Sequence, residues 1–455
     1  MRKHYHLIGI GGIGMSGIAQ LLLRRGITVS GSDIKESKLI EELRDLGAHI
    51  RMGHAPSNID GADLIVYSTA IQEDNPEVRE AKKKHIPLIK RAQALAELMR
   101  DKTVITVTGS HGKTTTASLV SWMLLEAGLK PSVAIGGILK NIENNAYLGE
   151  GNFFVAEADE SDGSFLYYQP QYSIITNIDR EHLDYYKNFD NELSAFKKFI
   201  AKTAGDGCLF CCNDDANLKL LLKDCKFRHV RFGLTHDADI YPDRIDVKGL
   251  SSEFDCFYKN KFVDRFLLAL GGRHNISNAL AIIALGIELG IAPEFIKKTL
   301  ANFRGARRRI DIKFEDKRYL LIDDYAHHPT EIRATLAAVK GLKSRVIAIF
   351  QPHRYTRTKL LLDEFGKCFA LADQVVVTDI YPASEPPIEG VTGELVQQEI
   401  KKYFPDKEAI YLAKEEIIPY ILKTVKPDDL IITLGAGDIV KIGDELAEGF
   451  KTKKG

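Results

Sequence analysis

Cysteine is scarce in this sequence, and neither charge is in excess. The six cysteines do not form the pair of CxxC motifs typical of a zinc site, and their spacing does not suggest a disulfide framework. Lysine plus arginine and aspartate plus glutamate balance at 62 each, so no overall field favours nucleic acid or an anionic membrane. No apolar run approaches the roughly 20 residues of a membrane span. We therefore expect a reduced, cytoplasmic protein without nucleic-acid binding or membrane insertion.

The chain of 455 residues is too long for one ordinary hydrophobic core and suggests about three domains. Short apolar runs alternate with helical patterns, which is typical of parallel α/β sheets. We expect α/β domains over residues 1–101, 102–306 and 307–455. Residues 230–270 alternate as short strands and predict an antiparallel excursion. The basic segment 304–310 (RGARRRI) is the candidate hinge.

Residues 103–124 (TVITVTGSHGKTTTASLVSWML) are the most informative stretch of the chain. A β-branched apolar run leads into a glycine-bearing loop with Lys-Thr, and a helical apolar pattern follows at once. In such a cradle, backbone N–H groups and the helix N-terminus face a phosphate, lysine adds a positive charge and a hydroxyl can hold Mg²⁺. The loop is shorter than the common form, because Val107 stands where the first glycine would be. We predict a nucleotide triphosphate site made by Gly109, Ser110, His111, Gly112, Lys113, Thr114 and Thr115.

A second glycine motif lies near the N-terminus, where Gly9, Gly11, Gly12 and Gly14 follow a strand and open a helix. Asp33 lies about 20 residues further on, at the end of the next strand, as in a dinucleotide-binding fingerprint. The motif alone would suggest NAD, with Asp33 on the ribose. However, the motif indicates only that a pyrophosphate can bind at this helix start, and a UDP-sugar contains the same group. Both ligands stay open on these residues.

Acidic residues beyond a strand end predict a metal site in the middle segment. Glu157 ends an apolar strand and is followed by Asp159, Glu160 and Asp162. Carboxylates placed in this way, in a domain with a phosphate cradle, can hold Mg²⁺. Four acids within six residues also suit a solvated loop, so only Glu157, which adjoins the strand, is our candidate. His182 follows a second strand and is a candidate for a metal or phosphate role, although lone histidines more often pack or cap.

Further candidates lie at a helix start and after two strands. Asn275 is a candidate N-cap of an apolar helix, and Asn278, a turn further on, could pair with a base edge. The segment DDYAHHP at 323–329 ends one strand, and QPHRYTR ends the next. Its arginines, Arg354 and Arg357, are spaced i, i+3, share one face of a helical turn and suit carboxylate capture. Because open α/β sheets bind ligands at strand carboxyl ends, we expect a site here.

Six motifs along the whole chain resemble those of the Mur ligase family. They are GIGGIGMSGIA, TGSHGKTT, EADESD, GRHNISNALA, DDYAHHPTE and QPHRYTR. The family motif T-G-x-x-G-K-T-T accounts for the shortened cradle. The resemblance implies a Rossmann-like UDP-sugar domain, a central P-loop-type ATPase domain and a C-terminal Rossmann-like domain for the amino acid. It further implies ATP- and Mg²⁺-dependent ligation of L-alanine to UDP-N-acetylmuramate, and we expect a monomer or weak homodimer.

Carried over position by position, the resemblance assigns roles to individual residues of this sequence. It implies that the UDP-sugar lies at Gly11, Gly12, Ile13, Gly14 and Asp33. It implies a phosphate lysine at Lys113 and metal ligands at Thr114, Glu157 and His182. It places the nucleotide against Asn275, Asn278, Arg309 and Asp324, and the amino acid against Tyr325, His327, His353, Arg354 and Arg357. Of these, Lys113, His327, Arg354 and Arg357 are the expected catalytic residues.

The implied mechanism forms an acyl phosphate from ATP and the muramyl carboxylate, which the amine of L-alanine then attacks. His327 or His353 could deprotonate that amine. Several family members carry a carbamylated lysine at the metal site, and no clear counterpart follows His182. Three alternatives stay open: a related ligase adding another amino acid or a recycled muramyl peptide, an NAD-dependent dehydrogenase that leaves the cradle unexplained, and a nucleotide-gated binding protein without catalysis.

Overall fold

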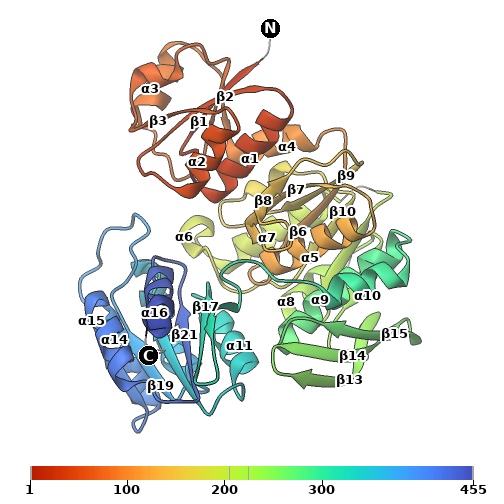
Figure 1. Ribbon diagram of the computed structural model, residues 1–455. Helices are drawn as coiled ribbons and strands as arrows, with labels where there is room; N and C mark the ends of the chain where they lie inside the picture. Colours follow the sequence, from red (N-terminus) through yellow and green to blue (C-terminus); the bar gives the residue numbers. More distant parts are fainter. Residues whose placement is uncertain (1–2, 204, 224, 453–455) are drawn as a thin grey trace. The chain divides into compact units, whose positions relative to one another are not determined.

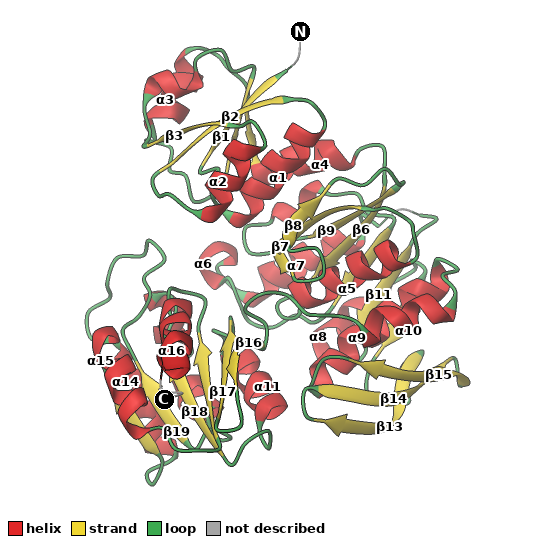
Figure 2. Cartoon of the chain, in the orientation of Figure 1, coloured by secondary structure: helices red, strands yellow, loops and turns green. Residues whose placement is uncertain are grey.

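The computed structural model describes residues 3–203, 205–223 and 225–452. Three sheets follow one another along the sequence, and helices flank them (Figures 1 and 2). This arrangement confirms the predicted class of three α/β domains. By internal contacts the chain forms two compact units, one of residues 1–243, 255–266 and 277–304, the other of residues 244–254, 267–276 and 305–455.

The first sheet has the order β3-β2-β1-β4-β5, and its paired strands all run parallel. Its strands are β1 (His4–Ile8), β2 (Thr28–Asp33), β3 (His49–Met52), β4 (Leu64–Tyr67) and β5 (Leu88–Lys90). The helices are α1 (Ile13–Arg24), α2 (Lys38–Asp45), η1 (Pro56–Ile59), α3 (Pro76–Lys83) and α4 (Arg91–Met99). The strand order reverses beside β1, and open α/β sheets bind ligands at such a point. The first glycine motif lies there, between β1 and α1.

The second sheet has the order β15-β14-β13-β12-β11-β10-β6-β9-β7-β8. Its strands are β6 (Thr103–Thr108), β7 (Ser132–Leu139), β8 (Asn144–Tyr147), β9 (Phe153–Glu157), β10 (Tyr172–Ile175), β11 (Cys208–Cys212), β12 (His229–Phe232), β13 (Ile240–Lys248), β14 (Ser251–Tyr258) and β15 (Lys261–Leu268). Its helices are α5 (Lys113–Glu126), η2 (Ser164–Tyr167), α6 (Leu183–Tyr186), α7 (Phe189–Ile200), α8 (Ala216–Leu222), α9 (Arg273–Glu288) and α10 (Pro293–Ala301). Both neighbours of β6 pair parallel to it, so the strand ahead of the cradle lies inside the sheet.

The predicted antiparallel excursion is confirmed for β13, β14 and β15. Two-residue turns join these consecutive neighbours in the sheet, and such short turns connect antiparallel strands. In the second turn, Lys259 and Asn260 have φ angles of 50° and 62°, the left-handed geometry that a tight hairpin uses. The excursion begins later than predicted, because β12 still pairs parallel to β11.

The third sheet has the order β16-β17-β21-β18-β19-β20. Its strands are β16 (Asp311–Glu315), β17 (Tyr319–Asp324), β18 (Arg345–Phe350), β19 (Gln374–Val377), β20 (Glu408–Tyr411) and β21 (Asp429–Leu434). Its helices are α11 (Pro329–Val339), α12 (Tyr355–Leu360), α13 (Leu362–Cys368), α14 (Gly393–Tyr403), α15 (Lys414–Thr424) and α16 (Val440–Thr452). Leu320 and Ile322 of β17 belong to one hydrophobic core and Leu321 to another, so both faces of the sheet are buried. Among the described strands of this sheet, only β16 pairs antiparallel, at the edge.

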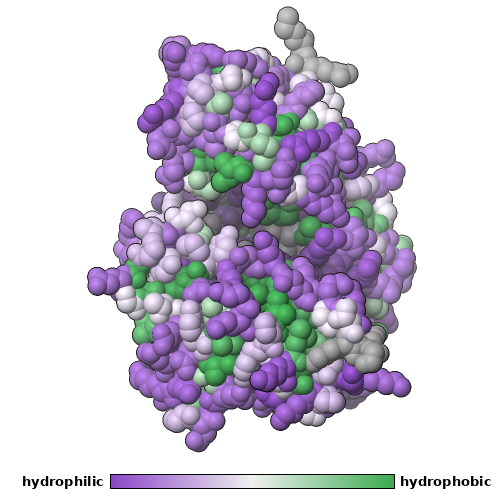
Figure 3. Space-filling view, turned by 60° about the vertical axis from the view of Figure 1, so that its left-hand side comes forward, coloured by the Kyte–Doolittle hydropathy of each residue, from purple (hydrophilic) through white to green (hydrophobic). Residues whose placement is uncertain are grey.

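Hydrophilic residues cover most of the face shown in Figure 3, with hydrophobic residues in smaller areas between them. Several large apolar side chains are exposed, including Ile34, Leu220 and Phe262. Among the helices of the described residues, none combines the length and the hydropathy needed to cross a membrane.

Candidate active site

The loop between β6 and α5 has the backbone geometry of a phosphate cradle. Gly109 has a φ of 123°, and a Cβ there would lie 2.3 Å from Thr176 Oγ1. Gly112 has a φ of 83° and precedes the first residue of α5, Lys113. Both glycines are therefore needed for this loop, because a side chain would be strained at either position. The predicted sequence of strand, loop and helix is confirmed.

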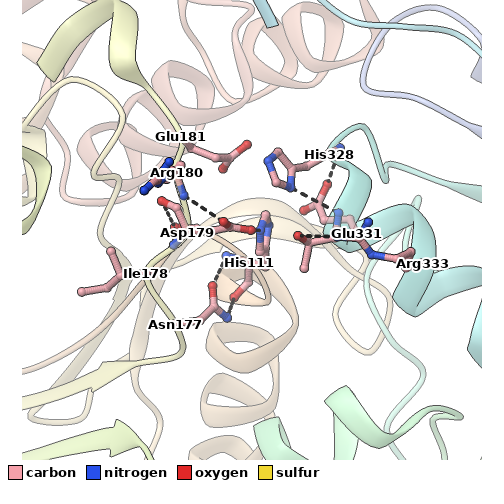
Figure 4. A network of polar contacts seen from close by, with 12 residues as sticks. His111, Asn177, Ile178, Asp179, Arg180, Glu181, His328, Glu331 and Arg333 are labelled. Carbon is pink, nitrogen blue, oxygen red and sulfur yellow. Dashed lines mark hydrogen bonds and ion pairs between the residues drawn. The ribbon is translucent and has the colours of Figure 1, made fainter. Parts of the chain in front are cut away.

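The segment after β10 fixes the cradle from the side (Figure 4). Asn177 accepts a hydrogen bond from the backbone N–H of His111 through Oδ1, at 2.8 Å. The ring of His111 lies 3.0 Å from Asp179 Oδ2, and the N–H of Asp179 donates to Ser110 Oγ at 2.8 Å. Thr176 Oγ1 donates to the carbonyl of His111 at 2.6 Å. These bonds hold the loop in shape before a phosphate arrives, which reduces the entropy cost of binding one.

Lys113 points back over the cradle, where its ammonium group is surrounded by oxygen atoms. It donates to the carbonyls of Gly109 and Ser110 at 2.6 and 3.1 Å, and to Glu160 Oε1 at 2.8 Å. Burial alone would lower the pKa of Lys113, but the charge of Glu160 and those of nearby acids outweigh it and raise the pKa. Lys113 therefore carries a full positive charge at the place where a phosphate would bind.

Thr114 and Glu157 form an oxygen pair beside Lys113. Thr114 Oγ1 lies 3.1 and 3.0 Å from the two carboxylate oxygens of Glu157. The N–H of Gly136 donates to Glu157 Oε2 at 2.8 Å, and a Cβ on Gly136 would lie 2.9 Å from either oxygen. Burial raises the pKa of Glu157, while the charge of Lys113 opposes that rise. The negative charge of Glu157 is balanced by few hydrogen-bond donors. A hydroxyl beside such a carboxylate suits a hard cation such as Mg²⁺.

The structure brings His182 against Glu160 and Glu181. His182 Nε2 lies 3.4 Å from Glu160 Oε1 and 3.7 Å from Glu181 Oε2. Burial lowers the pKa of His182, but its bond to Glu160 and the charge of Glu181 raise it overall. Its φ of 56° is unusual for a residue other than glycine. A nitrogen and two carboxylates within 4.8 Å of one another could hold a divalent ion.

The two asparagines of the GRHNISNALA motif have different surroundings. The prediction that Asn275 is a helix N-cap is wrong, because α9 already begins at Arg273 and Asn275 donates to the carbonyl of Gly271 at 2.8 Å. Asn278 packs on the cradle, since a Cβ on Gly112 would lie 3.0 Å from its Oδ1. Asn278 is therefore placed next to any nucleotide in the cradle.

In the first sheet, Asp33 shapes the glycine motif. Its Oδ2 accepts a hydrogen bond from the N–H of Gly11 at 2.9 Å, and its Oδ1 accepts from the N–H of Ile34 at 2.8 Å. Gly12 is the cap of α1, which begins at Ile13 as expected for a pyrophosphate-binding helix start. In the structure, Asp33 therefore supports the glycine loop between β1 and α1 through these hydrogen bonds.

In the second unit, Asp324 is buried at the end of β17. Its Oδ2 accepts from the N–H of Ile310 at 2.7 Å and its Oδ1 from the N–H of Ala326 at 2.8 Å. Burial raises its pKa to about 6, against the lowering effect of Arg309. Arg309 lies over the ring of Tyr325, 5.1 Å from its centroid. Asp324 therefore ties the segment around Arg309 to the end of the strand.

Of the three histidines in the third domain, His327 and His353 lie in different surroundings. His327 Nδ1 lies 3.0 Å from the carbonyl of Tyr325 and 3.1 Å from Glu331 Oε2, so Nδ1 carries the hydrogen and Nε2 accepts. Burial, together with the charges of His327 and Arg357, lowers the pKa of His353 to about 2. The rings of the two histidines are 5.5 Å apart. A general base must accept a proton, and the imidazole of His353 is too weakly basic to do so. His327 is therefore the better candidate for the base.

The expectation that Arg354 and Arg357 share one helical face is wrong. Arg354 precedes α12 as its cap residue with a φ of 72°, and only Arg357 lies in the helix. Arg354 Nε donates to Glu385 Oε1 at 2.5 Å, whereas Arg357 Nη1 lies 3.1 Å from His353 Nδ1. The two guanidinium groups therefore have separate supports.

Three family models match the chain in the order of its sheets. Residues 4–103 match the Mur ligase family catalytic domain, residues 107–286 the Mur ligase middle domain, and residues 308–437 the Mur ligase glutamate ligase domain. The chain belongs to the Mur ligase family. The resemblance read from the six motifs is thereby confirmed.

This Mur ligase is similar to proteins of known name over its full length. It is 45% identical over 450 residues to UDP-N-acetylmuramate–L-alanine ligase of Geotalea daltonii. The alignment covers 99% of this chain and 98% of the relative. The solved UDP-N-acetylmuramate–alanine ligase of Thermotoga maritima matches with a TM-score of 0.85 at 32% identity, over 99% of this chain and 100% of that one. A murein peptide ligase of Psychrobacter arcticus matches with a TM-score of 0.73 at 24% identity, over 98% of each chain, and shares the fold.

Four residues of this Mur ligase site were not singled out from the sequence. The sequence alone does not separate Glu160 from a solvated acidic loop, but in the structure Glu160 is completely buried and pairs with Lys113. Arg91 lies over the glycine motif, since a Cβ on Gly14 would be 3.0 Å from its Nη1. Glu331 and Glu385 support His327 and Arg354. Glu160 and Glu331 belong to the motifs EADESD and DDYAHHPTE, which are the signal for them in the sequence, whereas Arg91 and Glu385 lie far in sequence from the residues that they contact.

Proposed function

We propose that this Mur ligase joins L-alanine to the lactyl carboxylate of UDP-N-acetylmuramate, with ATP as the energy source, in the synthesis of peptidoglycan precursors. The observation that carries the proposal is the 45% identity, along nearly the entire chain, to a ligase with that name. We further propose that residues 1–101 bind the UDP-sugar, residues 102–306 bind ATP and residues 307–455 bind the amino acid. ATP is a metabolite of the cytoplasm, which supports a cytoplasmic enzyme, and we keep the prediction of a monomer or weak homodimer.

The donor set next to the cradle supports a requirement for Mg²⁺. Thr114 and Glu157 offer a hydroxyl and a carboxylate side by side, and these are ligands that Mg²⁺ prefers. His182 belongs to a neighbouring group with Glu160 and Glu181. When bound, the ion would withdraw negative charge from the phosphate oxygens of ATP.

In the first step, an oxygen of the muramyl carboxylate forms a bond to the γ-phosphorus as the bond to the bridging oxygen of ADP breaks. Two anions must approach each other here, so positive charge at the transferring group contributes most of the catalysis. Lys113 is charged and held over the cradle, and Arg309 is the second cation assigned to this role. Asn278, which packs on Gly112, contributes to placing the nucleotide.

In the second step, the amine nitrogen of L-alanine attacks the acyl carbon, and the tetrahedral intermediate releases phosphate. The amine must first lose a proton, and we assign the base to Nε2 of His327, with its Nδ1–H held by Tyr325 and Glu331. Arg354 and Arg357 would bind the carboxylate of the amino acid, since planar guanidinium groups pair well with carboxylates. The rings of Tyr325 and His353 both lie beside the ring of His327 and would limit the space for the substrate side chain.

The alternative is a related ligase that adds another amino acid or a recycled muramyl peptide, in view of the shared fold with a murein peptide ligase. Phosphate release measured with UDP-N-acetylmuramate, ATP and each member of an amino-acid and peptide panel separates the two. The proposal expects the highest kcat/KM with L-alanine. Preference for a diamino acid or a tripeptide would overturn it in favour of the alternative, and no turnover with any acceptor would overturn both.

A further inference from the structure

The backbone of Arg354 adopts a conformation that residues other than glycine rarely occupy. Its φ is 72° and its ψ is 134°, at the point where the chain passes from β18 into α12. Backbone strain of this kind persists only where surrounding contacts determine the conformation, and it is concentrated at functional sites. The neighbours of Arg354 must therefore provide that support.

Part of the support comes from the segment 381–385, which follows β19. The N–H of Arg354 donates to the carbonyl of Tyr381 at 2.8 Å, and the N–H of Tyr381 donates to the carbonyl of Pro352 at 2.8 Å. The ring of Tyr381 stacks on that of His353, with centroids 5.6 Å apart and planes 9° from parallel. The segment is itself held in an unusual shape, because Ala383 has a positive φ of 47°.

The same segment ends in Glu385, whose carboxylate contacts both Arg354 and the start of α12. Glu385 Oε1 accepts hydrogen bonds from Arg354 Nε at 2.5 Å and from Thr356 Oγ1 at 2.6 Å. Glu385 Oε2 accepts from the N–H of Thr356 at 3.0 Å. Its side chain is only 13% exposed. With both oxygens occupied, the carboxylate is fixed, and it in turn fixes the Nε edge of the guanidinium.

We propose that Glu385 is the positioning residue that orients Arg354 to receive the carboxylate of the amino-acid substrate. The inference rests on the proposed function, because it takes Arg354 to be part of the amino-acid site. Guanidinium–carboxylate recognition depends on the direction of the planar group, and the side chain of arginine has many rotamers. Glu385 selects one of them before the substrate binds, so the substrate does not bear the entropy cost of ordering the arginine. If Glu385 served only to keep its loop folded, its loss would not affect the binding of the amino acid more than that of the other two substrates.

The test is a split of kinetic constants among the three substrates. Glu385→Ala is expected to raise KM for L-alanine at least tenfold, with KM for ATP and for UDP-N-acetylmuramate changed less than twofold. Glu385→Gln, which keeps one acceptor for Arg354 Nε, should show a smaller rise. Glu389→Ala is the matched control, because Glu389 is exposed in the same loop. A Glu385→Ala enzyme with an unchanged KM for the amino acid, or with all three KM values raised together, would overturn the proposal.

A double-mutant cycle shows whether Glu385 acts through Arg354. Glu385→Ala introduced into an Arg354→Ala enzyme is expected to leave KM for the amino acid unchanged, whereas an independent contribution of Glu385 would multiply the two effects and contradict the proposal. Should Glu385→Ala lower the melting temperature, the Glu385→Gln variant is used in the same cycle with the same criteria. Failure of the proposed function has a different signature: the unmodified enzyme would then show no turnover dependent on L-alanine.

Discussion

The ammonium group of Lys113 lies 2.8 Å from the carboxylate of Glu160, a residue that is completely buried. The partner of this lysine is thus a carboxylate of the acidic motif. A nucleotide bound in the cradle would bring negative charge that competes with Glu160 for Lys113. We therefore expect nucleotide binding to be coupled to the position of Glu160, which also contacts His182.

Replacing Glu160 should destabilise the ligand-free protein more than the nucleotide-bound protein. Glu160→Gln leaves Lys113 without its counter-charge, and loss of one partner of a buried ion pair costs about 3 kcal/mol. ATP supplies the missing negative charge, so its stabilising effect in urea denaturation should be larger for the variant than for the unmodified protein. The control is Glu150→Gln, which removes the exposed ion pair with Lys130. It should change neither the free energy of unfolding without ATP nor the stabilisation by ATP. Equal stabilisation by ATP in both proteins would show that Glu160 and the nucleotide do not share Lys113.

Glu192 should make the stability of the protein depend on pH. Burial, together with the charges of Glu160 and Glu181, raises its pKa to about 8, against the lowering effect of a hydrogen bond with the backbone of Glu181. The folded protein therefore keeps this proton up to about pH 8, while the unfolded chain loses it near pH 4.5. The free energy of unfolding should fall as pH rises through that window and stay low above it.

Glu192→Leu removes the titrating group, so its unfolding free energy should lose this slope and exceed that of the unmodified protein above pH 8. Urea denaturation with a metal chelator present measures it. Asp190→Asn, on the exposed side of the same helix, is the control and should retain the slope. A slope that survives in Glu192→Leu would assign the titration to another group.

Gly136→Ala should weaken the binding of Mg²⁺. A methyl group at this position would lie 2.9 Å from both oxygens of Glu157 and push the carboxylate away from Thr114. Titration calorimetry of Mg²⁺ with a non-hydrolysable ATP analogue should show affinity reduced about tenfold or more, in line with lost support of a metal ligand. Gly205→Ala, where a Cβ would meet no atom within 4 Å, should bind as before. An unchanged affinity for Mg²⁺ in Gly136→Ala would show that Glu157 is not a metal ligand.

His327→Ala should lower kcat by about 10²-fold or more, the usual contribution of a general base. His353→Asn should have a smaller effect on kcat, because the pKa of His353 is lowered to about 2 and so weak a base takes up no proton under the conditions of the assay. Phosphate release measures kcat of both variants. An unchanged kcat in His327→Ala would mean that the base has to be sought elsewhere.

The sequence predicts the local elements well where pattern and function coincide. The strand before Gly109, the helix from Lys113 and the three α/β units follow from apolar periodicity and glycine placement, which depend on neighbours in the chain. The antiparallel edge strand β16 was not identified, because its register depends on pairing with β17 rather than on its own short pattern.

The supports of the site could not be predicted in the same way. Glu385 lies 31 residues after Arg354, and Glu160 lies 47 residues after Lys113. Neither spacing belongs to a helix or a hairpin, so only the folded chain brings these pairs together. The shared helical face expected for Arg354 and Arg357 was wrong for a related reason: the contacts of Arg354 with residues 381–385 hold it in a conformation that excludes it from the helix.

In the proposed reaction, ATP activates the carboxylate of UDP-N-acetylmuramate for attack by an amine. The most direct test supplies this substrate with ¹⁸O in both carboxylate oxygens, together with ATP, Mg²⁺ and L-alanine, and analyses the released phosphate by mass spectrometry. An acyl phosphate transfers one labelled oxygen to each phosphate, and the amide keeps the other. We expect one ¹⁸O in every phosphate released by the unmodified enzyme, and none above background with Lys113→Ala. Unlabelled phosphate from a productive reaction, or full labelled turnover by Lys113→Ala, would contradict this expectation.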